Sequence, residues 1–408
     1  DLKRRGKQNK DIENKNLQDP HSQELHDDML REQAGLRKIR DEIKKKTLFN
    51  LLTEEGLLPN YAFPEEGVTL RSIVYRKREQ HTAQGKPYEV FEYAYQRPAA
   101  AALKELAPNN HFFAGGRKIT IDQVELRFRG EGSGDERSAD IEHWRFCNAC
   151  TYMRQELSGA QGTVVEPACP RCDSPLWRDQ GQVCNLIRMR QVFSNMSLQE
   201  SLSGDDSDER AYRPYEQALL VNFEAEDIHQ AYMCQEEAFP FGFEFIEKVQ
   251  LREVNFGEGA GGLSQLEVNG TQLNGAGFIL CRYCGKVQPH DVRQHETKQR
   301  HSPICRRGTR KGDEVFIESA YLYRSFQSEA LRIFMPDTGM HRQGLSDVSF
   351  TAAILIGLKA FFSGNVDHLQ SAPYHEPIAG EGQRSKDYLI LYDTVPGGTG
   401  YLKQLASP

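Results

Sequence analysis

The sequence predicts an α+β protein of several domains, in which zinc-ribbon knuckles are inserted between β-rich segments and an α/β unit lies at the C-terminus. Three observations support this prediction. Two groups of cysteines have metal-ligand spacing, several runs have the alternation or branched side chains of strands, and an apolar helix over 349–362 and a buried strand over 387–393 are expected. A length of 408 residues is sufficient for two or three hydrophobic cores.

The composition is that of a globular protein, with 38% hydrophobic and 27% charged residues and a net charge of −7. No apolar run reaches the roughly 18–20 residues that cross a bilayer, and the charged N-terminus lacks the apolar core of a signal peptide. We therefore expect a cytoplasmic protein with reduced cysteines and no membrane partner. Because the chain is acidic, an anionic partner would have to meet a local basic patch. The chain begins at Asp1 and ends at Pro408 in mid-pattern, so we expect a piece of a larger protein.

Six consecutive segments are expected along the chain. They are a charged linker with an amphipathic helix (1–55), a β-rich segment (56–143), a four-cysteine zinc ribbon (144–180), a mixed β segment with an acidic loop (181–278), a basic zinc knuckle with three cysteines and one histidine (279–311) and an α/β domain (312–408).

Periodicity and Gly/Pro punctuation predict the elements within these segments. Helices are expected over 21–52, 97–108 and 349–362. Strands are expected over 68–77, 88–95, 118–128, 243–255, 277–280, 314–324, 331–335 and 387–393.

The cleaner of the two cysteine groups has the spacing C-x2-C-x18-C-x2-C. Its members are Cys147, Cys150, Cys169 and Cys172. Each CxxC turn places two thiolates on one side of the chain, and two facing turns complete a tetrahedral S4 shell. Such a closed shell has no open coordination position, so the sequence predicts a structural zinc site; an iron–sulfur cluster has the same ligands and is the minor alternative.

A second group lies in the stretch CRYCGKVQPHDVRQHETKQRHSPIC. Cys281, Cys284 and Cys305 are expected ligands, and a histidine is expected to be the fourth. His301 fits best because it precedes Cys305 by four residues, while His290 and His295 compete with it. The sequence therefore predicts two zinc sites.

The second group also lies in the most basic part of the chain. Between Cys281 and Lys311 there are nine Lys and Arg residues against two acidic ones, in a chain that is otherwise acidic. A charge run is usually a solvated face, but here it adjoins a metal knuckle, which favours contact with nucleic-acid phosphates. The residues expected to contact DNA are Arg293, Lys298, Arg300, Arg306, Arg307, Arg310 and Lys311.

A third feature is YLILYDTVPGGTG, a buried strand that ends at Asp393 and continues into a glycine-rich turn. No Walker A, DEAD/DEAH or dinucleotide-binding motif occurs in the sequence. Gly397 and Gly398 are therefore interpreted as residues that permit positive φ and close packing. A metal-dependent nuclease with Asp367, Glu376 and Asp393 as ligands is an alternative, although acidic residues form such sets by chance.

The motif YLILYDTVPGGTGYLKQL resembles the MrfA-type zinc-binding domain, which follows the two motor domains in a branch of superfamily 2 DEAD/DEAH-type DNA helicases. The stretches LLPNYAFPEEGVTL, RPAAAALKELAPNN and GGRKITIDQVEL resemble the region after the motor in the same family, so the resemblance extends over about residues 50–408. The family motif PGG-x-G falls on Pro396, Gly397, Gly398 and Gly400. In the family a further cysteine cluster follows this motif, whereas the present chain ends before it.

The resemblance implies a role in DNA repair or in anti-phage defence, where helicases of the Druantia type are the expected group. ATP and Mg2+ would bind only to the motor domains of the parent protein, and whether this segment is itself an enzyme is left open. The expected function is an accessory region that grips or guides DNA or docks a partner. The expected partners are DNA, the motor domains and a subunit of a defence system. A protein-binding scaffold without DNA contact is the remaining alternative.

Overall fold

The computed structural model describes most of the chain after residue 66. The described residues are 30, 31, 34, 35, 37, 38, 44, 67–77, 88–129, 138–139, 141–156, 166–202, 213–234, 241–259, 266–289, 300–302, 305, 315–334, 345–364, 366–377 and 385–407. Within the helix expected over 21–52, only seven residues are described, and all seven are helical.

The chain divides into two compact units, each assembled from three stretches. Unit 1 contains residues 1–141, 187–215 and 277–322, and unit 2 contains 142–186, 216–276 and 323–408. The six consecutive segments expected from the sequence stay a prediction, because each compact unit draws on several of them.

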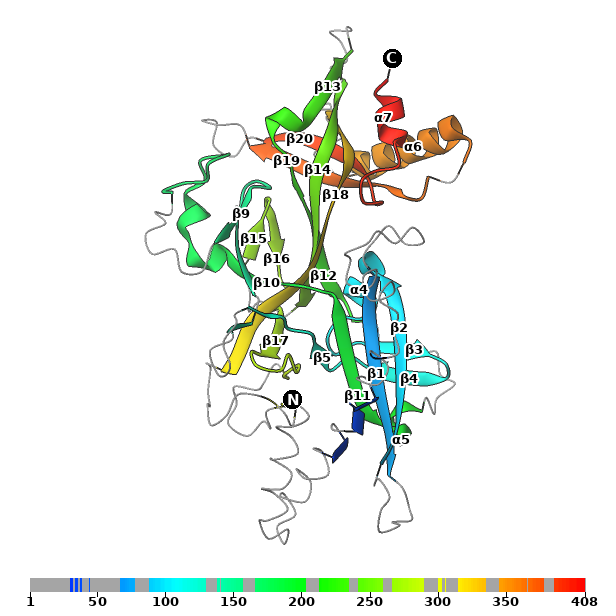
Figure 1. The fold of residues 1–408 in the computed structure, drawn as a ribbon. Helices are drawn as coiled ribbons and strands as arrows, with labels where there is room; N and C mark the ends of the chain where they lie inside the picture. The colour runs from blue at the N-terminus through cyan, green and yellow to red at the C-terminus, as the bar shows by residue number, and fades with distance from the viewer. Residues whose placement is uncertain are drawn as a thin grey trace. The chain divides into compact units, whose positions relative to one another are not determined.

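Unit 1 is built on a four-stranded sheet of order β2-β1-β11-β5. The strands are β1 (Gly67–Lys77), β2 (Tyr88–Pro98), β5 (Gln123–Val124) and β11 (Gln191–Ser197). β1 pairs antiparallel with β2 and parallel with β11 (Figure 1). Alternate residues of β1 are buried, and Val68 and Leu70 join a core with Leu103 of α4 (Ala99–Glu105). The period-2 pattern of β1 therefore gives the sheet its buried face.

The other elements of unit 1 extend this core. They are β3 (His111–Ala114), β4 (Arg117–Thr120), β6 (Phe128–Arg129), β7 (Ser138–Ala139), α5 (Leu198–Ser201) and β17 (Phe278–Cys281). β17 pairs antiparallel with the first residues of β18 (Phe316–Phe334).

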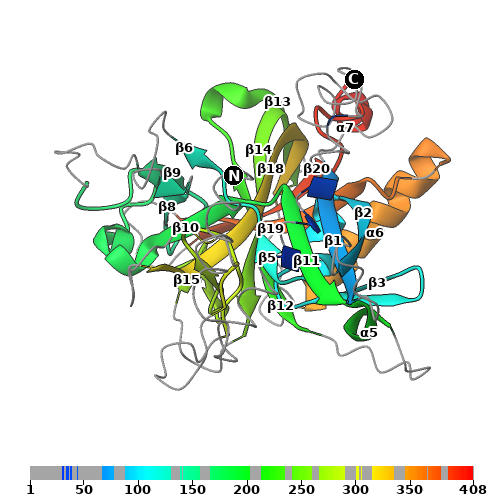
Figure 2. The same ribbon diagram turned by 60° about the horizontal axis from the view of Figure 1, so that its bottom comes forward.

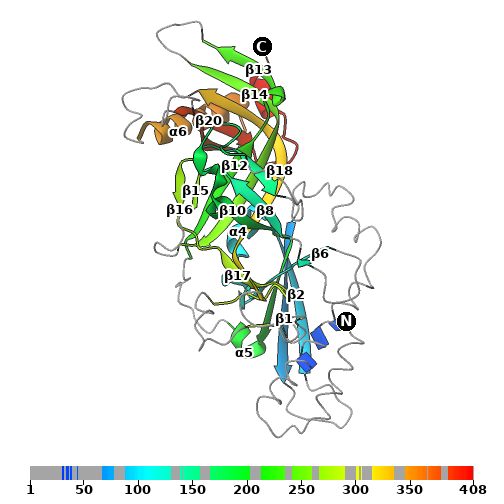
Figure 3. The same cartoon turned by 90° about the vertical axis from the view of Figure 1, so that its left-hand side faces the viewer.

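Unit 2 contains most of a ten-stranded sheet whose main path is β12-β14-β18-β10-β8-β9. Besides β18, its strands include β8 (Glu142–Phe146), β9 (Met153–Glu156), β10 (Val183–Arg188), β12 (Tyr215–Asn222), β13 (Ile228–Met233) and β14 (Gly242–Glu258). The hairpin of β13 and β14 is visible in Figure 3. Short elements complete the unit: η1 (Pro175–Arg178), η2 (Gln180–Gln182), η3 (Ala225–Asp227), β15 (Leu266–Val268) and β16 (Thr271–Leu273).

The C-terminal part of unit 2 mixes strands and helices, as expected. It contains α6 (Leu345–Phe362), β19 (Leu369–Pro377), β20 (Ser385–Asp393) and α7 (Tyr401–Leu405). β20 pairs antiparallel with both β18 and β19, and α6 packs through Leu358 on the core that Leu331 and Leu389 help to form. In the described part of the chain, no helix is long and apolar enough to cross a membrane.

Most predicted elements are present, with two corrections. The strand expected over 118–128 is wrong: β4, β5 and β6 are separate because they pair with three different strands, β3, β11 and β7. The two strands expected over 314–324 and 331–335 are one strand, β18. The polar run between them is also extended, because its side chains find partners in neighbouring segments.

Candidate metal centres

The first cysteine group comes together in unit 2 within the turn between β8 and β9 and a second turn that precedes η1. The Sγ atoms of Cys147 and Cys172 are 3.5 Å apart, and those of Cys150 and Cys169 are 3.7 Å apart. All four sulfurs lie within 4.8 Å of one another. A tetrahedron with metal–sulfur bonds of about 2.3 Å has edges of about 3.8 Å, so the sulfurs are spaced as zinc ligands are.

Backbone hydrogen bonds hold each CxxC turn in this shape. The N–H of Ala149 donates to Cys147 Sγ and that of Tyr152 to Cys150 Sγ, each at 3.4 Å. The second turn closes through Asp173, whose N–H donates to the carbonyl of Cys169 at 2.9 Å and whose φ is +58°. The N–H groups of Ala149 and Tyr152, which donate to sulfur, favour thiolates over thiols and thereby favour metal binding.

Hydrogen bonds among the sulfurs separate their pKa values. The hydrogen bond with Cys147 lowers the pKa of Cys169 and that of Cys172. For Cys150, the hydrogen bond with Cys147 raises the pKa. Four thiolates at this spacing repel one another unless a cation lies between them. The donor set and its spacing therefore fit a tetrahedral metal ion.

An aromatic and cationic layer encloses the first group. Trp177 is fully buried against Cys147, Cys150 and Cys169. Arg145 is also fully buried, and it donates to the carbonyl of Trp177 at 2.6 Å and to Glu156 at 2.5 Å. Neither residue could be assigned to the site from sequence spacing. They exclude solvent from the cluster, as expected of a structural site.

The second group comes together in unit 1. Cys281 Sγ lies 3.5 Å from Cys305 Sγ and 3.3 Å from His301 Nδ1, and Cys284 is within the same 4.8 Å group. His301 is thus placed among the three cysteines with Nδ1 toward the sulfurs. Its competitors His290 and His295 lie outside the described residues.

The knuckle that carries Cys281 and Cys284 is docked against β5. Gly285 donates its N–H to the carbonyl of Cys281 at 2.8 Å and accepts from the N–H of Val124 at 2.9 Å. A Cβ on Gly285 would lie 1.9 Å from the carbonyl oxygen of Val124, and φ is +71°, so only glycine fits. Gln123 Nε2 also donates to the carbonyl of Cys284 at 2.8 Å.

A buried glutamine joins the two halves of the second group. Gln288 is 2% exposed, and its Oε1 accepts from the N–H of Arg300 at 2.8 Å. Its Nε2 donates to the carbonyls of Arg300 and Lys286, the latter at 3.0 Å. His301 is the next residue after Arg300, and its ring stacks on Phe316, with ring centroids 5.9 Å apart. Because neither Gln288 nor Phe316 is a metal-ligand type, sequence reasoning had no signal for them.

Of the residues expected to contact DNA, only Arg300 is among the described residues, and it is exposed. Arg293, Lys298, Arg306, Arg307, Arg310 and Lys311 lie outside the described residues. The acidic loop expected near residue 205 also lies largely outside them.

The glycine turn after β20 has a structural role that its hydrogen bonds explain. The backbone N–H groups of Gly397, Gly398, Thr399 and Gly400 donate to Gln327, Val395, Asp393 and Glu329, respectively. All four are used within the protein, so the turn does not offer them to a phosphate. The three glycines of the motif have positive φ, and a Cβ on Gly398 would lie 2.6 Å from Glu329 Cγ. Positive φ is confirmed for both Gly397 and Gly398, and close packing is confirmed for Gly398, whereas an added Cβ on Gly397 would have nothing within 4 Å.

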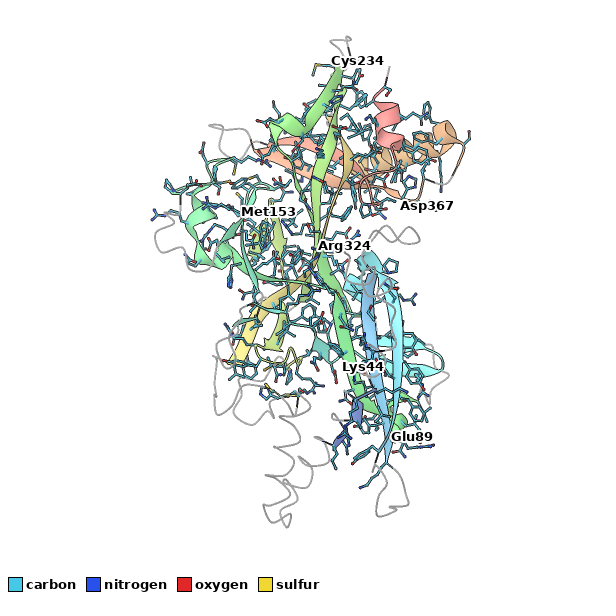
Figure 4. All side chains as sticks on the ribbon, viewed as in Figure 1. Lys44, Glu89, Met153, Cys234, Arg324 and Asp367 are labelled. Atoms are coloured by element: carbon cyan, nitrogen blue, oxygen red, sulfur yellow. The ribbon has the colours of Figure 1, made fainter. Side chains whose placement is uncertain are left out.

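The three carboxylates of the nuclease alternative do not gather. Asp393 is fully buried; its Oδ1 accepts from the N–H of Val395 and its Oδ2 from the N–H of Thr399. Glu376 pairs with Arg332 at 3.1 Å, and Asp367 with Lys359 at 3.4 Å. Asp367 is also remote from the first cysteine cluster. In Figure 4, Asp367 and Met153, the residue that begins β9 after the first CxxC turn, are on opposite sides of unit 2. Among the described residues, the only groups that could hold a metal are the two cysteine clusters.

The comparisons with known proteins give one structural match. No protein-family model matches the sequence, and no curated protein matches it. The fold is similar to a crystal structure of the DUF1998 helicase MrfA bound to DNA, with a TM-score of 0.32 and 8% sequence identity. The match covers 84% of this chain and 28% of that one, so the chain spans less than a third of that helicase.

Proposed function

We propose that this chain is an accessory region of an ATP-dependent DNA helicase, in which two zinc ions hold the fold and the basic knuckle over residues 279–311 grips or guides DNA. The parent protein would act in anti-phage defence or DNA repair. Its motor domains would bind ATP and Mg2+, and those domains and a defence-system subunit would be the other partners. The motif over residues 388–405 supports the helicase assignment through its resemblance.

The observation that carries the DNA contact is the closure of the basic segment by the second cluster. Cys281 and Cys284 meet His301 and Cys305, so a metal ion there would tie together both ends of a stretch that includes Arg293 and Lys298. Fixing cations on a rigid frame reduces the entropy that they lose on binding phosphate. It also concentrates positive charge on one part of an acidic chain, which is the electrostatic requirement for DNA binding.

Charge reversal within the knuckle tests this proposal. We expect Arg306, Arg307, Arg310 and Lys311, all changed to Glu, to weaken DNA binding by about tenfold or more and to reduce its salt dependence, because each phosphate contact releases counterions. Binding of the zinc-loaded 408-residue chain to a labelled oligonucleotide would be followed by fluorescence anisotropy from low to moderate salt.

The matched control reverses four lysines of unit 2: Lys248, Lys359, Lys386 and Lys403, each exposed. It changes the net charge by the same amount and is expected to leave the affinity close to that of the wild type. Equal affinity and equal salt slope for the knuckle variant and the wild type would contradict the proposal. If the wild type bound no DNA at low salt, the protein-binding scaffold would become the better explanation.

A further inference from the structure

The β3–β4 hairpin of unit 1 projects from the sheet and ends in a two-glycine turn (Figure 2). Gly115 and Gly116 have φ of +57° and +70°, as a tight hairpin turn with two left-handed residues requires. The tip carries no side chain beyond Cα, so the backbone there can approach another molecule closely.

The two faces of this hairpin differ. The cross-strand pair Phe112 and Ile119 is buried in the core of unit 1, with exposures of 6% and 0%. The next pair toward the tip, Phe113 and Lys118, faces outward, and Phe113 is 37% exposed. Directly opposed residues on one face have Cβ atoms about 5 Å apart, so the side chains of Phe113 and Lys118 leave the hairpin next to each other.

The charge around this outward face is positive. No acidic residue lies between Glu105 and Asp122, and β4 places the exposed Lys118 on this face. His111 lies on the same face, and its Nδ1 is 3.0 Å from Thr120 Oγ1. Burial lowers the pKa of His111, and the charges of Lys118 and Arg213 lower it further, which indicates a local positive potential.

We propose that the outward face of the β3–β4 hairpin is a contact for single-stranded DNA, in which a base stacks on Phe113 and the adjoining phosphate meets Lys118. An exposed aromatic ring beside cations is the combination that binds unpaired bases without sequence preference. The paired bases of a duplex are stacked and do not offer a free face to Phe113. This inference rests on the proposed DNA contact and names a second surface and the form of DNA that it prefers.

Three variants of the zinc-loaded 408-residue chain test the inference. Phe113→Ala removes the ring, Phe113→Tyr keeps it, and Ile356→Ala shortens an exposed apolar side chain of α6 in unit 2, where 68% of Ile356 is exposed. Each would be titrated against oligothymidine and against a blunt duplex. A single strand with one 2-aminopurine would report stacking through fluorescence quenching.

We expect Phe113→Ala to weaken oligothymidine binding by about tenfold and to abolish the quenching, since a base–aromatic stack contributes about 1–3 kcal/mol. Duplex binding should stay within about twofold of the wild type, and Phe113→Tyr and Ile356→Ala should behave like the wild type. Unchanged oligothymidine binding by Phe113→Ala, or an equal loss on the duplex, would overturn the inference.

The knuckle charge reversal, titrated in parallel, separates this result from the proposed function. If it weakens both DNA forms while Phe113→Ala changes neither, the hairpin inference fails and the DNA-gripping knuckle stands. If the wild type binds neither DNA form, both proposals fail together.

Discussion

The two metal centres have almost the same donors, yet they are embedded in different ways. In the first, the sulfurs lie under Trp177, and the buried Arg145 binds the backbone behind that ring. In the second, Gly285 and Gln123 dock the CxxC turn of Cys281 and Cys284 on β5. Gln288 holds the backbone of Arg300, directly before His301. The first centre is therefore supported by side chains packed around the four sulfurs, and the second by hydrogen bonds to the backbone next to its ligands.

This difference indicates what each centre does for the protein. Three of the four cysteines of the first centre are buried, and a metal ion held in such a packed core mainly stabilises that core. A metal whose ligands bracket a basic stretch also controls where that stretch can go, since its binding free energy is coupled to local folding. We expect the first centre to control stability and the second to control stability and DNA affinity together.

The largest expected effect comes from removing one thiolate from each centre. Cys169→Ser should lose one zinc ion per chain and destabilise unit 2 by more than about 5 kcal/mol, because structural zinc contributes roughly 10–16 kcal/mol in apparent binding free energy. Cys305→Ser should also lose one zinc ion, with a smaller loss of stability and a loss of DNA binding. Elemental analysis, denaturant unfolding and anisotropy would measure these effects.

Cys234→Ser is the control, since Cys234 is exposed and belongs to neither cluster. It should keep both zinc ions and full stability. Fewer than two zinc ions in the wild type, or equal stability losses for both cluster variants, would remove the distinction between the two centres.

A glycine near each centre gives the next test. Gly285→Ala places a methyl group against the carbonyl of Val124 at positive φ, so we expect it to cost about 3–5 kcal/mol and to weaken zinc binding at the second centre. Gly270 donates its N–H to Asn148 beside the first centre and has φ of +71°, but nothing lies within 4 Å of its added Cβ. Gly270→Ala should therefore cost only about 1–2 kcal/mol.

Urea unfolding and competition for zinc with a chromogenic chelator would compare the two variants. A similar cost for both would mean that the second knuckle is not docked on β5 as tightly as its geometry indicates.

The two candidate ligand sets could be predicted from the sequence, because metal coordination depends on residue type and short spacing. CxxC steps place the four cysteines of the first centre in two turns, and the choice of His301 for the second set agrees with its position among the three cysteines. What encloses the ligands has no such signature. Trp177 and Gln288 come to the centres through contacts that no period of 2 or 3.6 marks.

For the fold, too, local elements could be predicted and long-range contacts could not. Branched and aromatic side chains identified β1 and β2, a buried apolar run identified β20, and the apolar stretch 349–362 identified α6. The two interleaved units could not be predicted, because their boundaries depend on pairings between distant segments. The polar middle of β18 was missed for the same reason. Ser328 and Glu329 are tolerated there because Ser328 donates to Val395, and Glu329 accepts from Gly400 in the glycine turn.

The smallest expected effect is the loss of stability when the ion pair beside each centre is broken. Lys286 Nζ lies 2.6 Å from Asp122, with side-chain exposures of 17% and 23%, whereas Arg154 lies 3.2 Å from Glu166, with exposures of 31% and 47%. Lys286→Met leaves a largely desolvated carboxylate without its cation, and we expect a cost of about 1–2 kcal/mol. Arg154→Met should cost less than about 1 kcal/mol, because solvent screens the pair that it breaks.

The pH dependence of the Lys286 effect identifies its cause. Burial raises the pKa of Asp122 and Lys286 opposes that rise, so in the folded state the carboxyl group binds its proton more tightly than in the unfolded chain. A raised acid pKa means that Asp122 lowers the stability as pH increases through that pKa, and the loss of Lys286 makes the decrease steeper. The difference between wild type and Lys286→Met should therefore shrink as the pH falls from neutral. A pH-independent difference in urea unfolding would mean that Lys286 supports the second knuckle by packing its methylenes and not through its charge.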